Sequence, residues 1–149
     1  MKTILFIFIG TLAVAGSADV RPNQLAVCGI GGVISYISLS VFEHMGANEI
    51  IGIFMSAVFV TVYSEITARI LKTPATVFLY SGIVPLLPGG SLFHTVLCLI
   101  QKNSDGFVSL GIYTLIRSVS ISMGIVTAAS IFVLPGSLKS RLKKRVFRK

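Results

Sequence analysis

The chain has 149 residues, of which 54% are hydrophobic and only 12% are charged, and its mean hydropathy is +0.90. A soluble domain has about 25% charged residues, so the composition excludes a soluble protein and predicts an all-α integral membrane protein in a lipid bilayer. The net charge of +8 is concentrated near the end, because seven of the 13 basic residues follow Gly136. We therefore divide the chain into a single transmembrane domain, residues 1–136, and a basic cytoplasmic tail, residues 137–149.

Five apolar runs predict five transmembrane helices, because short polar stretches with turn and helix-stop residues separate them. In chain order they are Thr3–Ala18, Leu25–Phe42, Ile50–Ala68, Ala75–Ile100 and Phe107–Leu134. The first run also resembles a secretory signal peptide, because it ends in a stretch of small residues.

The distribution of basic residues predicts the orientation. If the basic tail is cytoplasmic, five helices place Arg21, Arg69 and Lys72 in internal loops and Lys102 in an outer loop. This arrangement follows the positive-inside rule, whereas cleavage after Ala18 would leave four helices and an outer tail. We therefore expect five retained helices in the cell membrane, with the amino terminus outside and the carboxyl terminus inside. The tail is then a topology anchor; anionic lipid is an alternative ligand for it, and nucleic acid is not an expected partner.

The fourth run, Ala75–Ile100, has no charged residue, but the segment Pro85-Leu-Leu-Pro88-Gly89-Gly90-Ser91 interrupts it. As one helix the run would be about 39 Å long, which exceeds a hydrocarbon core of about 30 Å. Two prolines and a Gly-Gly pair predict that the fourth helix is broken. Freed backbone inside a bilayer is tolerated only where protein or a water-filled cavity satisfies it.

This break is the candidate substrate site, because many transporters bind their substrates at broken helices. The carbonyl groups before Pro85 and Pro88 lack their usual donors. The amide groups of Gly89, Gly90 and Ser91 open the second half-helix, and a helix start attracts anions. A carboxylate-bearing solute would fit there. The alternative is a re-entrant hairpin or a kink that serves packing alone.

Three ionisable residues inside the runs are further candidates, since such residues are costly in a membrane. Arg117 lies about eleven residues into the fifth run, near mid-depth, and is a candidate for binding substrate. The alternatives are a structural pair with Glu65 and snorkelling of the side chain toward a lipid headgroup. Glu65 and His94 are candidates for proton or ion coupling. The alternatives are a local ion pair between Glu65 and Arg69 and a simple interhelical hydrogen bond from His94.

Enzyme signatures are absent from the sequence: it has no phosphate-binding loop, no HExxH, no GxSxG and no paired carboxylates at a common depth. Cys28 and Cys98 lack the spacing of a metal site or a redox pair. We therefore expect neither an enzyme, nor a metal site, nor a cofactor.

The sequence resembles the threonine/serine exporter family, in particular the short, membrane-only subunit of its split two-gene form. The resemblance rests on Ala68-Arg69, Pro74 and the segment Pro85-Leu-Leu-Pro88-Gly89. It extends to the later segment 120–125, which is similar to the family's final glycine-containing helix.

The resemblance implies a membrane subunit of a secondary transporter that exports threonine and serine, or a related small carboxylate such as succinate. It also implies a larger membrane subunit of the same family as partner. Two alternatives remain open: a non-transporting subunit that stabilises a larger membrane partner, and a homo-oligomeric channel.

Overall fold

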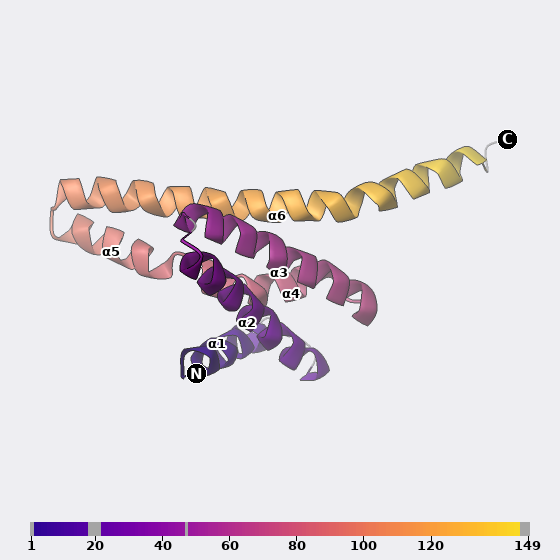
Figure 1. Cartoon of the computed structure of the whole chain (residues 1–149), viewed down its shortest axis with the longest axis horizontal. Helices are drawn as coiled ribbons and strands as arrows, with labels where there is room; N and C mark the ends of the chain where they lie inside the picture. The colour runs from indigo at the N-terminus through magenta and orange to yellow at the C-terminus, as the bar shows by residue number, and fades with distance from the viewer. Residues whose placement is uncertain (1, 18–21, 47, 147–149) are drawn as a thin grey trace.

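The computed structural model describes residues 2–17, 22–46 and 48–146, and the regular structure in these ranges is entirely helical. Figure 1 shows the elements in chain order. They are α1 (Lys2–Ser17), α2 (Pro22–His44), α3 (Glu49–Leu71), α4 (Ala75–Gly82), the short 3-10 helix η1 (Val84–Leu86), α5 (Gly89–Ile100) and α6 (Ser104–Val146). The all-helical prediction is confirmed, while Ala18 and Arg21 lie outside the described residues.

Three of the described helices are long and apolar enough to cross a membrane, namely α2, α3 and the part of α6 up to Phe132. A fourth crossing results if α4, η1 and α5 count as one bent span. The first helix is shorter: its 16 residues extend about 24 Å, less than a hydrocarbon core of about 30 Å. The structure thus supports three or four spans, and the fifth stays a prediction.

Local signals in the sequence set the ends of α3. The side chain of Asn48 accepts a hydrogen bond from the backbone N–H of Ile50, as a helix N-cap does. At the other end Lys72 adopts a left-handed conformation, with φ of 52°, and Pro74 then leads into α4. The predicted polar stretches around Asn48 and Pro74 therefore are the turns on either side of this helix.

Helix α3 lies at the centre of the fold, because α2, α4 and α6 all pack against it. Small residues permit this packing. A Cβ atom on Gly82 would lie 2.6 Å from a methyl carbon of Val60, and one on Gly124 would lie 2.7 Å from the carbonyl oxygen of Phe54. One cluster of buried side chains joins α3, η1 and α6, and it consists of Ile53, Ala57, Leu86 and Ile121.

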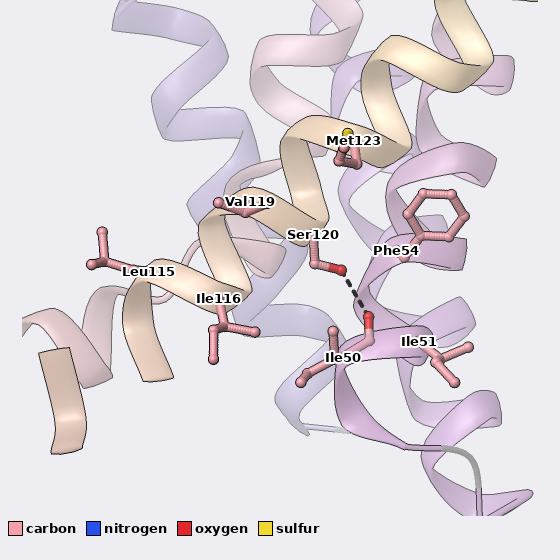
Figure 2. A pocket seen from close by; sticks show the side chains of 8 residues that line it. All are labelled: Ile50, Ile51, Phe54, Leu115, Ile116, Val119, Ser120 and Met123. Carbon is pink, nitrogen blue, oxygen red and sulfur yellow. Dashed lines mark hydrogen bonds between the residues drawn. The ribbon is translucent and has the colours of Figure 1, made fainter. Parts of the chain in front are cut away.

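Helix α6 contacts the start of α3 near Ser120, sixteen residues after α6 begins at Ser104. The Ser120 hydroxyl donates a 2.8 Å hydrogen bond to the carbonyl oxygen of Ile50, which Figure 2 shows. The part of α6 before this contact, residues 104–119, therefore continues about 24 Å beyond the first residue of α3, away from the rest of that helix. They form a hairpin with α5, which packs mainly against α6. We call α5 together with residues 101–119 the arm; Figure 1 shows it reaching beyond the ends of α2 and α3.

The contact between α3 and α6 predicts that Gly124→Ala destabilises the protein. The new methyl group would meet backbone and Ala57 Cβ at 2.7–2.8 Å, so the helices must separate, at a cost of about 1–3 kcal/mol. Thermal unfolding in detergent micelles measures the effect. Gly111→Ala, in the same helix, is the matched control, because its Cβ would lie at an ordinary 3.7 Å from Thr95. Equal melting temperatures for the two variants would contradict the predicted packing.

Candidate functional site

The Pro-Leu-Leu-Pro segment lies between the separate helices α4 and α5, and a broken fourth transmembrane helix stays a prediction. Helix α4 ends at Gly82, η1 covers Val84–Leu86, and α5 begins at Gly89 with a bend of 57°. Neither proline can donate a backbone hydrogen bond. Whether the two halves form one bent span or a re-entrant loop depends on where the membrane lies.

The three candidate amides of the break do not have equal environments. The Gly89 N–H donates to the carbonyl oxygen of Leu87 at 2.8 Å, so this donor is already engaged. A Cβ atom on Gly89 or Gly90 would meet nothing within 4 Å, and both residues are exposed, whereas Pro88 is buried and Ser91 half-buried. A ligand could therefore approach the backbone at the two glycines.

Arg117 pairs with a carboxylate that sequence reasoning did not single out. Its Nη1 lies 3.5 Å from Oε1 of Glu49, the first residue of α3. The Tyr113 hydroxyl donates a short hydrogen bond of 2.5 Å to Oε2 of the same carboxylate. The guanidinium carbon lies 5.6 Å from the centre of the Tyr113 ring, within the range of a cation–π contact. Glu49, Tyr113 and Arg117 thus form one cluster between α3 and α6, which we call the carboxylate cluster.

One signal in the sequence could have revealed part of this cluster. Tyr113 precedes Arg117 by four residues, so both lie on one face of a helix. The partner Glu49 gave no such signal, because its approach depends on how far α6 extends past the start of α3. Relative to α3, Arg117 lies at the start of the helix, whereas the sequence placed it near the middle of its own run.

The cluster and the break lie at similar levels along α6. A Cβ on Gly111 would touch Thr95, and one on Gly106 would touch Cys98, so α5 and α6 run antiparallel. This register, continued toward the break, brings Pro88 level with Arg117. In the described residues no hydrogen bond or ion pair connects Arg117 to the Gly89–Ser91 segment, because the guanidinium turns toward α3 instead. A joint substrate site of Arg117 with Gly89, Gly90 and Ser91 remains a prediction.

Glu65 and Arg69 do not form the local ion pair that the four-residue spacing suggests. The Arg69 guanidinium instead donates to the carbonyl oxygen of Phe132 at 3.2 Å and lies 5.1 Å from the centre of the Phe132 ring. Glu65 is half-buried. Arg69 thereby attaches the end of α3 to α6, and Glu65 stays a candidate for ion coupling.

His94 lies on the arm, on the exposed side of α5. Its ring contacts Phe93 edge-on, with ring centres 5.6 Å apart. The predicted hydrogen bond to a neighbouring helix is absent from the described residues, which leaves the coupling role of His94 as an untested prediction. The described residues also contain no group of three or more His, Cys, Asp or Glu side chains that could hold a metal ion.

A groove of about 480 Å³ opens between the start of α3 and the middle of α6, and Figure 2 shows its lining. Ser120 is the single polar residue in this lining, and its hydroxyl is engaged with the Ile50 carbonyl. The groove therefore suits an apolar side chain or an acyl chain rather than a charged amino acid. Its lining consists of Ile50, Ile51, Phe54, Leu115, Ile116, Val119, Ser120 and Met123.

Comparison with known proteins relates the chain to a family. A family model described as "Threonine/Serine exporter, ThrE" matches residues 3–131. No curated protein matches the chain, and no solved structure does. The matched range includes the break, the carboxylate cluster, Glu65 and His94.

The short bond between Tyr113 and Glu49 predicts that Tyr113→Phe lowers stability by about 1 kcal/mol. The substitution removes only the hydroxyl and leaves the ring beside Arg117. Thermal unfolding in detergent measures the change. Tyr80→Phe is the matched control, since Tyr80 is 62% exposed. A loss of stability in the control as large as that in Tyr113→Phe would mean that the hydroxyl of Tyr113 has no special role.

Proposed function

Because the chain belongs to the threonine/serine exporter family, we propose that it is the membrane-only subunit of a two-chain secondary transporter. Its solutes are the small hydroxy amino acids threonine and serine, or a related small carboxylate such as succinate. The family is one of transporters rather than enzymes. The proposal includes five spans, a broken fourth span, and an orientation with the amino terminus outside and the carboxyl terminus inside.

The observation that supports the transport role is a largely buried arginine in the helix that packs against α5. The side chain of Arg117 is 17% exposed, and a guanidinium binds carboxylates through its planar donors. Pro88, level with Arg117 in the α5–α6 register, interrupts the neighbouring helix. We assign Arg117 to the carboxylate of the solute, and Pro85, Pro88, Gly89, Gly90 and Ser91 to the backbone surface on which the solute rests.

The arm supports the proposal of a larger partner subunit. The arm extends past the start of α3, where α5 packs mainly against α6. Its exposed face carries large apolar side chains, whose contact with water is unfavourable, so lipid or another protein must cover them. On α5 these are Leu92, Phe93, Val96, Leu99 and Ile100.

A second membrane protein that packs on the arm would cover these side chains. The same feature would also fit the alternative of a stabilising subunit without a transport role. A homo-oligomeric channel is the third possibility. Export measurements separate these functions, because only a transport subunit contributes solute-binding residues of its own.

We expect Arg117→Ala and Pro88→Ala to reduce threonine export at least tenfold while membrane insertion stays normal. Arg117→Ala removes the proposed carboxylate ligand, and Pro88→Ala allows the helix to continue through the break. Export from cells loaded with a threonine-containing dipeptide provides the measurement. Lys102→Ala, which removes an exposed positive charge at the tip of the arm, is the control for net charge. Wild-type export by both variants would refute the assignment of the site.

The arm predicts that Val96→Asp weakens assembly with the larger subunit. A carboxylate on this face would be buried without a partner in the complex. Co-purification with a tagged larger subunit measures assembly, and Ser109→Asp, at an exposed polar position of the arm, is the control. Undiminished co-purification of Val96→Asp would show that the partner does not cover this face.

A further inference from the structure

Most hydrogen-bond donors of Arg117 in the carboxylate cluster have no close acceptor. A guanidinium has five N–H donors, and the single ion pair of Arg117 in the described residues, to Glu49, is 3.5 Å long. Charge-assisted bonds of this kind are usually about 2.7–2.9 Å. The Nε atom of Arg117 is also buried without a hydrogen-bond partner. The present arrangement therefore leaves the binding capacity of Arg117 largely unused.

The carboxylate of Glu49 is well placed to leave Arg117. Its side chain is 41% exposed, so it can reach water. It lies in the first turn of α3, where the helix dipole favours a negative charge. Its second oxygen accepts the hydrogen bond from Tyr113. A Glu49 that turned away from Arg117 would therefore keep two favourable interactions.

We propose that Glu49 is a built-in competitor that occupies Arg117 between transport events and that the carboxylate of the solute displaces it. This inference rests on the proposed function, because it takes Arg117 as the solute ligand. The ligand class is a small carboxylate. Tyr113 is a positioning residue: its hydroxyl holds Glu49 in place, and its ring lies beside the guanidinium.

The proposal makes Glu49 and Arg117 act in opposite directions on solute affinity. In Glu49→Gln the amide oxygen can still accept the Tyr113 hydrogen bond, but the charge that competes for Arg117 is gone. We expect the half-saturating threonine concentration for export to fall about fivefold, the scale of one partly exposed ion pair. Arg117→Gln should raise the half-saturating concentration. Tyr113→Phe should lower it, by less than Glu49→Gln does.

Three controls separate competition from a structural role. Glu43→Gln removes an exposed carboxylate of the α2–α3 region that has no contact with Arg117 in the described residues, and it should leave the half-saturating concentration unchanged. In an Arg117→Gln background, Glu49→Gln should have no further effect on affinity. Inhibition of export by L-threoninol, which has an alcohol in place of the carboxylate, should be the same in wild type and Glu49→Gln.

The outcomes distinguish this inference from the proposed function. If the wild-type chain supports threonine export but Glu49→Gln leaves the half-saturating concentration unchanged or raises it, the competitor role is wrong and the transport function stands. If Glu49→Gln strengthened inhibition by L-threoninol as much as it raised the affinity for threonine, the competitor role would also be wrong, because the effect would not depend on the carboxylate. If cells with and without the chain export threonine equally, the proposed function itself fails.

Discussion

The crossing of α3 and α6 determines where Arg117, Glu49 and the arm lie relative to one another. At Gly124 the two helices approach so closely that a single methyl group would collide with backbone, and at Ser120 a hydrogen bond fixes their register. Both interactions are short-range and tolerate little displacement. Because they lie near the middle of α6 and near the start of α3, they bring Arg117 to Glu49 and leave the first part of α6 free of the other long helices. The carboxylate cluster and the arm are therefore two results of one packing geometry.

The apolar surface of the arm is understandable only in a membrane protein. In water the arm would be an exposed apolar hairpin, so its outer face requires lipid or another protein as cover. Its tip carries polar residues at Gln101–Asn103, and its base lies beside the polar start of α3. The apolar arm therefore separates two polar levels that lie about 20 Å apart along α6.

The sequence predicted features that depend on local chemistry. The all-helical fold and the turns at Asn48 and Pro74 follow from residues that act on their own backbone. The end of α4 before Pro85 and Pro88 has the same origin, while a broken fourth span stays a prediction. Features that depend on the distance between helices cannot be predicted from the sequence. The spacing of Glu65 and Arg69 suggested an ion pair, yet Arg69 reaches Phe132 on another helix. Likewise Arg117 was known to need a partner, but hydropathy gives no information on the relative height of two helices, so Glu49 went unrecognised.

The continuity of α6 has a mechanical consequence. Its 43 residues form one helix from Ser104 to Val146, about 64 Å along its axis, which includes part of the arm, Arg117 and the beginning of the basic segment; Figure 1 shows that it curves toward the carboxyl terminus. The stretch that precedes Pro135 is held at Ser120 and Gly124 and behaves as a lever, with this contact as its pivot. A partner that tilts the arm would swing the far end of α6 the opposite way, while Arg117, close to the pivot, would move only a little. The carboxylate cluster thus lies where a small displacement is enough to lengthen or shorten one ion pair, and the ends of the helix lie where the same rotation is largest.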